Sequence, residues 1–382
     1  MGLFENIFGK KPSVINGSSN WQTMTAYAPT FTTRNASLYE YELVRSAINC
    51  RALNMSKLKV EMIGTSQPVL KTRIKSRPNS FQTWSQFLYR LSTILDMQNT
   101  AFIVPLNDEF GRPVGFFPIL PSTCELVEYN GVAYAKYKFK NGKIASIELD
   151  KVGIMTKFQY EHDIYGSSNS ALRPTAQMLD LNRQGLQEAV KNSATYRFMA
   201  KVNNFSKVED LKNERKRFTE ENFKGEGGGI LLFPNTYQDI KQVDVKPVVI
   251  DKDQIELMKT NVFSYFGVNE KLIQNEASAD QFGVFYENVV EPFAIQLSEV
   301  LSKMVYTERE MNNGNIIMAT SNRLQYMSNK DKLSVSSQMA DRGLMSINEI
   351  REIWNLPPID GGDKFPRRGE YYYGDEEEKE NE

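Results

Sequence analysis

Apolar residues recur every three or four positions in several stretches of the chain, which is the spacing of an amphipathic helix. Helix starts are marked in three places by a serine followed three residues later by Glu or Gln, at Ser206, Ser278 and Ser346. The pattern as a whole predicts helices over residues 38–64, 83–97, 172–200, 206–224, 251–267, 278–306 and 346–356.

Between these helices the pattern changes to short β-rich runs. Residues 101–106 form one run, and two Asn-Gly pairs, Asn130-Gly131 and Asn141-Gly142, separate three more. Asn-Gly is typical of a tight hairpin turn, because both central residues of that turn need a positive φ. The sequence therefore predicts a small antiparallel meander. After the glycine-rich run 225–229, residues 230–233 and 240–245 predict a second, smaller sheet.

Two of the predicted helices are unusual for a single globular domain. The helix at 172–200 has a narrow apolar stripe on an otherwise polar surface, so much of it must meet water or other subunits. The helix at 278–306 contains Pro292, and an internal proline removes a backbone hydrogen bond and clashes with the preceding turn. We expect a kink at Pro292, and we expect both long helices to serve self-assembly.

The composition is that of a folded protein without a strong charge. Its 382 residues are too many for one ordinary hydrophobic core. Its formal net charge is -1, so the chain lacks the excess of Lys and Arg with which proteins wrap nucleic acid. Two cysteines and no apolar run of bilayer length predict a protein of a reducing cytoplasm that does not span a membrane. Residues 1–35 predict a flexible arm, and 369–382 a disordered acidic tail.

Candidate chemistry is sparse. His162 is the only histidine, which excludes a His-paired nucleophile and a two-histidine metal centre within one subunit. The run 225–229 lacks the spacing of a phosphate-binding loop, and the carboxylates of 207–226 are balanced by lysines and arginines. Residues 51–77 carry seven basic side chains against Glu61, a patch that we interpret as a docking surface or a solvated face. We expect no catalytic, cofactor-binding or metal-binding residues.

Several motifs follow one another in a characteristic order. They are Met1-Gly2-Leu3-Phe4, Arg77-Pro78-Asn79, Asn99-Thr100-Ala101-Phe102, Phe266-Gly267-Val268 and Glu291-Pro292-Phe293. The most specific is Arg342-Gly343-Leu344-Met345-Ser346-Ile347-Asn348-Glu349-Ile350-Arg351, followed by Leu356-Pro357-Pro358 and Gly361-Gly362-Asp363. In this order the motifs resemble those of the portal proteins of long-tailed bacteriophages, from Met1 to Phe365. Gln98 and Asn269 depart from that family, in which glycine and proline are usual there.

The resemblance implies an elongated α+β fold with a wing, a stem, a clip and a crown, in which the stem helices are long and the tunnel helix is kinked. It assigns the wing to residues 36–170, and the other parts follow along the chain. They are a stem helix at 171–200, a clip α/β insert at 201–250, a second stem helix at 251–267, a tunnel loop at 268–280, the kinked tunnel helix and its return to the wing at 281–325, and a crown at 326–368.

The same resemblance implies a non-enzymatic subunit without a cofactor. About a dozen copies would form a ring at one capsid vertex, through which double-stranded DNA is packaged and ejected without sequence-specific binding. The implied partners are the terminase large subunit, the head-tail adaptor, and the major capsid and scaffolding proteins, in a virion assembled in the host bacterial cytoplasm. The residues that the resemblance places nearest to the DNA are Asn269, Glu270, Lys271, Gln274 and Asn275, with Pro292 at the kink.

Two other classes of protein stay open. One is a different structural subunit of a phage head, such as an adaptor, which the number of subunits and the channel diameter of a ring would distinguish. The other is an enzyme that acts on nucleic acid with carboxylate-bound metal, which requires clustered acidic residues in a folded core. The sequence shows no such cluster, and a metal-dependent DNA cleavage assay would separate this class from a portal protein.

Overall fold

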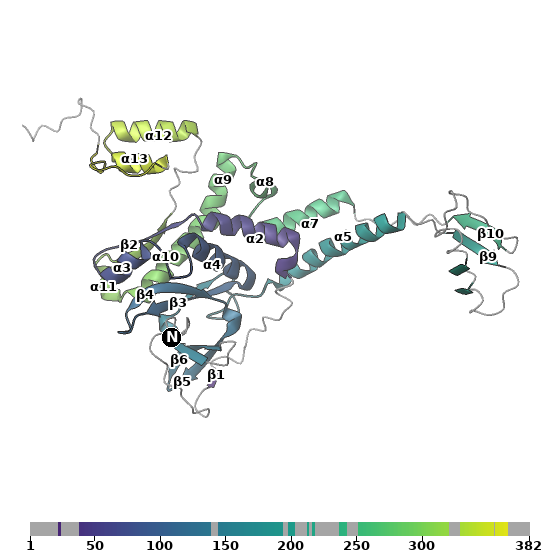
Figure 1. The fold of residues 1–382 in the computed structure, drawn as a ribbon, viewed down its shortest axis with the longest axis horizontal. Coiled ribbons are helices and arrows are strands. Elements are labelled where there is room, and N and C mark those ends of the chain that lie inside the picture. Colours follow the sequence, from purple (N-terminus) through teal and green to yellow (C-terminus); the bar gives the residue numbers. More distant parts are fainter. Residues whose placement is uncertain are drawn as a thin grey trace, which may run out of the picture. The chain divides into compact units, whose positions relative to one another are not determined.

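The computed structural model describes residues 22–23, 38–138, 144–193, 198–202, 212–213, 216–217, 237–242, 251–320, 329–354 and 356–365. Contacts divide the chain into two compact units, one of residues 177–258 and one of residues 1–176 with 259–382. The helices (Figure 1) are α2 (Glu42–Met55), α3 (Pro68–Ile74), α4 (Trp84–Gln98), α5 (Arg173–Ser193), α7 (Lys252–Tyr265), α8 (Glu270–Ile273), α9 (Ala279–Phe285), α10 (Glu291–Val305), α11 (Glu308–Asn312), α12 (Asn329–Asp341) and α13 (Ile347–Ile353).

The strands form small antiparallel sheets. Two sheets of the larger unit have the orders β4-β3-β8 and β1-β5-β6-β7, and two pairs are β11-β2 and β10-β9. The strands are β1 (Gln22–Thr23), β2 (Lys59–Ile63), β3 (Thr100–Asn107), β4 (Pro113–Ile119), β5 (Cys124–Tyr129), β6 (Val132–Lys138), β7 (Ile144–Glu148), β8 (Gly153–Thr156), β9 (Phe198–Val202), β10 (Tyr237–Gln242) and β11 (Ile316–Thr320).

Strand β3 lies at the centre of the larger unit. It is buried at every position except its last, so both of its faces are covered. On one face Phe102 and Val104 share a core with Leu126 and Ala135 of the meander sheet β5-β6-β7. Helix α4 contacts β3 as well, and α2 packs against α4 (Figure 1). The predicted strand at 101–106 is confirmed, and its continuous apolar run follows from this double coverage.

The N-terminus of α4 and one hairpin turn follow their local sequence signals. The Thr83 hydroxyl accepts a hydrogen bond from the Gln86 N–H, and Gln86 Oε1 accepts one from the Thr83 N–H, which completes a capping box. Asn130 and Gly131 have φ of +52° and +77°, the positive values that a tight turn between β5 and β6 requires. The helix at 83–97 and the first two strands of the meander are therefore confirmed. The second pair, Asn141-Gly142, lies outside the described residues.

The prediction of one helix from residue 38 to near Gly64 is wrong in its second half. Helix α2 ends at Met55, and residues 59–63 form β2, whose side chains are alternately exposed and buried. The strand pairs with β11 in the register Ile63 to Ile316. A strand of this length is stabilised by its partner, and that partner lies far along the chain. The helical periodicity of the preceding residues therefore could not indicate where the helix ends and the strand begins.

Gly153 in β8 lies where α10 comes close to the sheet. A methyl group at this position would overlap Met304 Sδ and would lie 2.7 Å from Val300 Cγ1. Helix α10 also packs on β11, where Ser302 Oγ accepts a hydrogen bond from the Ile317 N–H at 2.9 Å. The helix thus joins the central sheet to the β2-β11 pair.

In the smaller unit the prediction is partly wrong. Helix α5 begins at Arg173 with Pro174 in its first turn, as expected, but residues 198–202 form β9 instead of continuing the helix to 200. Strand β9 pairs with β10, which begins before the strand predicted at 240–245. The capping box at Ser206, the run 225–229 and the strand at 230–233 lie outside the described residues.

At the two ends of the chain little is described. Within the arm predicted at 1–35, Gln22 and Thr23 form β1, which pairs with β5 of the same chain. The acidic tail at 369–382 lies outside the described residues. Among the residues that the structure describes, no helix combines the length and apolar character needed to cross a membrane.

Candidate functional site

The C-terminal end of α7 is closed by a glycine turn, as the sequence predicts. Gly267 has a φ of +67°. Its N–H donates to Ser264 O at 3.0 Å, and the Val268 N–H donates to Phe263 O at 3.0 Å. These two bonds make a Schellman motif, which satisfies carbonyls that the helix leaves without partners. The chain therefore leaves α7 in a defined direction.

The segment after this turn, residues 268–280, is here called the loop segment. It was expected to be a polar loop, but it contains the short helix α8, which Asn269 caps by accepting from the Leu272 N–H at 2.9 Å. Val268 and Leu272 are buried, and α8 contacts α2. The asparagine that stands where the family usually has proline thus has a capping role.

The five residues predicted to face DNA are all exposed on the loop segment; they are Asn269, Glu270, Lys271, Gln274 and Asn275. Gln274 Nε2 donates to Glu270 Oε1 at 3.2 Å across one turn. Asn275 has a φ of +61°, a conformation that asparagine adopts more readily than most residues. The structure brings these side chains together on one short segment, and their contact with DNA stays a prediction.

The loop segment leads into an interrupted helix. The predicted capping box of Ser278 and Gln281 is confirmed and starts α9. Between α9 and α10 lies a π-helical turn, Tyr286–Val290, and Pro292 stands exposed in the first turn of α10. A proline in the first turn of a helix costs no backbone hydrogen bond, because the N–H groups of that turn have no partner within the helix. The π turn before it replaces the regular spacing of the backbone hydrogen bonds by a wider one. The irregular turn ends just before Pro292, and the kink at Pro292 itself stays a prediction.

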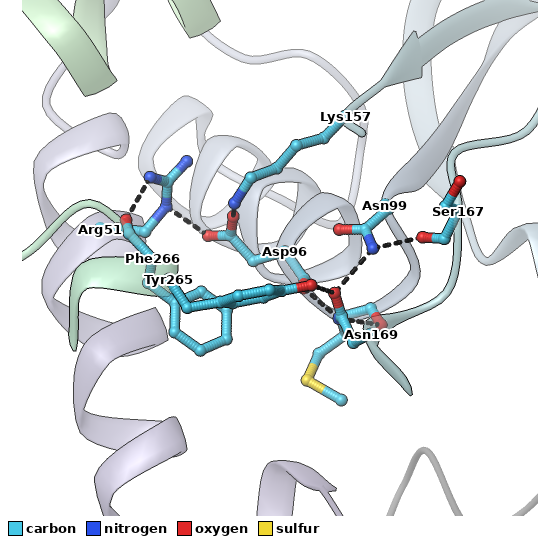
Figure 2. Close-up of polar contacts among 9 residues, drawn as sticks. Arg51, Asp96, Asn99, Lys157, Ser167, Asn169, Tyr265 and Phe266 are labelled. Carbon is cyan, nitrogen blue, oxygen red and sulfur yellow. Dashed lines mark hydrogen bonds and ion pairs between the residues drawn. The ribbon is translucent and has the colours of Figure 1, made fainter. Parts of the chain in front are cut away.

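Beneath the start of the loop segment lies a buried cluster of charges (Figure 2). Arg51 of α2 donates from Nε to Asp96 Oδ2 of α4 at 2.8 Å and from Nη1 to Phe266 O at 2.6 Å. Lys157 Nζ lies 3.1 Å from Asp96 Oδ1, so both carboxylate oxygens are engaged. Asp96 is 1% exposed. We call Arg51, Asp96 and Lys157 the charge cluster.

Lys157 is held mostly out of water. Burial lowers the pKa of its ammonium group below the usual range, the nearby Arg51 acts in the same direction, and Asp96 opposes both. The ammonium nitrogen also lies 5.5 Å from the centre of the Phe266 ring and 4.9 Å from that of Phe158. The cation–π contact with Phe266 adds a second link between the charge cluster and the end of α7.

Asn169 joins the C-terminal ends of two helices next to this cluster (Figure 2). Its Nδ2 donates to the carbonyls of Asp96 and Met97 in the last turn of α4, at 2.9 and 3.0 Å. Its Oδ1 accepts from the Tyr265 hydroxyl in the last turn of α7 at 2.7 Å and from Asn99 Nδ2 at 2.7 Å. The end of α7 is therefore held from two sides, by Arg51 and by Asn169.

Sequence reasoning missed this cluster and misread part of it. Arg51 was counted in the basic patch at 51–77, but it is buried and paired, so that interpretation is wrong for Arg51. Lys59 of the same patch is exposed and lies within ion-pair distance of Glu61 and Glu352. The available signal was the position of Arg51 in the apolar stripe of its helix, because a charge on a buried face needs a buried partner.

No group of three or more His, Cys, Asp or Glu in the described part of the chain is arranged to hold a metal ion.

The chain matches the sequence profile of the family described as "Phage portal protein" over residues 42–355. Two curated proteins named "Probable portal protein", of Lactococcus phages p2 and SK1, are each 25% identical to it over 123 residues. That alignment covers 31% of this chain and 32% of each relative, so it spans about a third of their length.

Two solved structures show the same fold. A chain of the "Neck of empty GTA particle computed with C6 symmetry", where GTA is a gene transfer agent, superposes with a TM-score of 0.62 at 15% identity over 88% of this chain and 96% of that one. An HK97 family phage portal protein from Corynebacterium diphtheriae superposes with a TM-score of 0.51 at 14% identity over 75% of this chain and 94% of that one. At these identities the likeness is one of fold.

Proposed function

The chain belongs to the phage portal protein family, a class of structural proteins rather than enzymes, and we propose that it forms the ring at one capsid vertex through which double-stranded DNA enters and leaves the head. The observation that carries the proposal is the family match over residues 42–355, together with a mixed helix and sheet fold like that of portal proteins. The ring would dock the terminase large subunit during packaging and the head-tail adaptor afterwards.

The exposed apolar side chains of α5 support self-assembly. Met178, Leu181 and Leu186 are 52%, 64% and 41% exposed. Exposed apolar side chains that gather on one element mark an interaction surface more often than scattered ones do. The neck chain that this fold resembles belongs to a particle computed with cyclic symmetry. We propose a closed ring of about a dozen subunits, since head-to-tail interfaces close into rings.

The proposal assigns a part of the portal architecture to each group of helices and strands. The larger unit, with its two sheets and α2 and α4, supplies the wing, while α5 and α7 supply the stem. The β9-β10 pair belongs to the clip, and α12 with α13 forms the crown. Residues 268–280 would be the tunnel loop, at the narrowest part of the channel.

The charge of the loop segment suits a passage through which DNA slides. The segment contains one lysine, Lys271, and three acidic residues, Glu270, Glu276 and Asp280. Each lysine or arginine that neutralises a phosphate adds affinity by releasing counterions, so a collar rich in these residues would hold the DNA in place. A segment with one lysine and three carboxylates cannot grip phosphates in this way.

Ring formation is tested on the purified full chain by native mass measurement and negative-stain imaging, with and without the scaffolding protein. We expect closed rings with a central channel wide enough for duplex DNA. A monomer under every condition would count against the proposal. A ring of another subunit number, seated on the tail side of an existing portal, would favour an adaptor.

The loop segment is tested by replacing Lys271 and Gln274 with tryptophan in a phage complementation assay. We expect rings to assemble but the packaged genome to be shorter or less well retained, because bulky side chains would narrow the channel. Lys330→Trp, at an exposed position of α12, is the matched control. Full-length, stably retained genomes in the loop variants would show that the segment does not line the channel.

A further inference from the structure

The charge cluster is unbalanced. Arg51 and Lys157 face one carboxylate, that of Asp96, and the three side chains are 9%, 20% and 1% exposed. When both bases are protonated, one positive charge in this cluster has no carboxylate of its own. A buried charge without a partner is strongly destabilising. The surrounding groups must therefore supply negative potential.

Two helix ends supply it. The C-terminal end of an α-helix carries the negative end of its dipole, equivalent to about half an elementary charge. Asp96 lies in the last turn of α4, and Phe266 directly follows α7. Because Arg51 donates to Phe266 O at 2.6 Å, that carbonyl is a third acceptor of the cluster. Moving the end of α7 would leave Arg51 with Asp96 alone.

Beyond Phe266 the contacts change in kind. Gly267 turns the backbone, and Val268 and Leu272 are the buried side chains of the first two turns. Residues 274–276 are all exposed. The buried charged contacts thus end at Phe266, and apolar packing holds the start of the loop segment up to these exposed residues.

We propose that Arg51 and Asp96 are positioning residues that lock the end of α7 and so fix where the loop segment starts. The proposal rests on the proposed function for its consequence, which is that a fixed base keeps the loop at a constant distance from the channel axis. Lys157 and Asn169 support the lock from the side of the central sheet.

The lock is tested with Arg51→Lys. Lysine keeps the positive charge but lacks the planar fork with which arginine reaches Asp96 Oδ2 and Phe266 O together. Amide hydrogen exchange of residues 264–276 should become at least about tenfold faster, because a hydrogen bond from a charged donor contributes more than the ~1.4 kcal/mol that a factor of ten represents. Exchange of residues 84–90, at the other end of α4, should change little.

Arg45→Lys is the matched control, since Arg45 lies on the same helix and donates to Tyr39 O at an exposed position. Equal exchange of residues 264–276 in the two variants would overturn the lock. If Arg51→Lys does not fold, Tyr265→Phe is the milder variant, because it removes only the hydroxyl that donates to Asn169. It should speed exchange in the same segment, and no change there would overturn the part of the proposal in which Asn169 supports the lock.

Genome retention in a complementation assay separates the lock from the function. Faster exchange with reduced retention supports both the lock and the role of the loop segment in the channel. Faster exchange with normal retention supports the lock and counts against that role. Unchanged exchange rejects the lock whatever the retention, and leaves the proposed function to the tests of ring formation and of the loop variants.

Discussion

Replacing Gly267 by alanine should destabilise the protein by about 1–2 kcal/mol, the cost of placing an ordinary residue in a left-handed conformation. The φ of +67° at Gly267 gives the conformation, and the surroundings give a second cost. The added Cβ would lie 3.0 Å from Val289 Cγ2, which is too close for an unstrained contact, and 3.8 Å from Arg51 Nη1. The distance to Arg51 is an ordinary van der Waals contact, so the change would strain the turn and press on Val289 without displacing the charge cluster.

Gly283 is a control in which the same substitution should act in the opposite direction. It lies inside α9, and a Cβ there would meet nothing within 4 Å. Glycine in a helix interior costs roughly 0.5–1 kcal/mol relative to alanine, so Gly283→Ala should be slightly stabilising. The two variants carry the same added methyl group, and they differ in the backbone conformation and in the contact with Val289.

The measurement is guanidinium denaturation followed by circular dichroism at one fixed protein concentration, because self-association makes apparent stability depend on concentration. The midpoint of Gly267→Ala should fall and that of Gly283→Ala should stay or rise. A Gly267→Ala midpoint at or above that of the parent protein would refute the assignment of a strained turn at the base of the loop segment.

Four further predictions use the same denaturation assay. Thr83→Ala should cost about 1 kcal/mol by removing the capping box of α4, and no loss would contradict the capping geometry. Asp96→Asn should cost about 3–5 kcal/mol, because it leaves two buried bases without their carboxylate; a loss below 1 kcal/mol, roughly that of a surface pair, would mean that the cluster is not buried. Gly153→Ala should destabilise by forcing Met304 away from the sheet, and a neutral result would contradict the close packing of α10. Deleting residues 374–382, which contain no apolar residue, should leave the midpoint and the self-association unchanged.

Elements specified by neighbouring residues could be predicted from the sequence. The capping boxes at Ser278 and Ser346, the glycine turn at Gly267 and the turn at Asn130-Gly131 all depend on residues within a few positions of one another. Such signals act through local hydrogen bonds and backbone conformation, so they hold wherever the rest of the chain lies.

Features specified by distant residues could not be predicted. Strand β2 exists because β11 pairs with it in the register Ile63 to Ile316. Arg51 finds Asp96 and Phe266 at separations of 45 and 215 residues. The apolar stripe of α2 showed that one charge faced inward, but nothing in the sequence named its partner. Long-range pairing of this kind is a property of the folded arrangement and not of any local pattern.

Charged side chains hold the base of the loop segment, although apolar side chains could give the fold the same stability. Buried ion pairs are often replaceable by hydrophobic residues without loss of stability, so stability alone does not explain the cluster. Apolar packing is not directional, whereas the guanidinium of Arg51 is satisfied only when Asp96 Oδ2 and Phe266 O occupy set positions. In the proposed channel, DNA would slide past a loop that needs a directional attachment at its base and weak attraction along its exposed part. The proposed lock at Phe266 would give the first, and the loop segment after it, with one lysine and three carboxylates, would give the second.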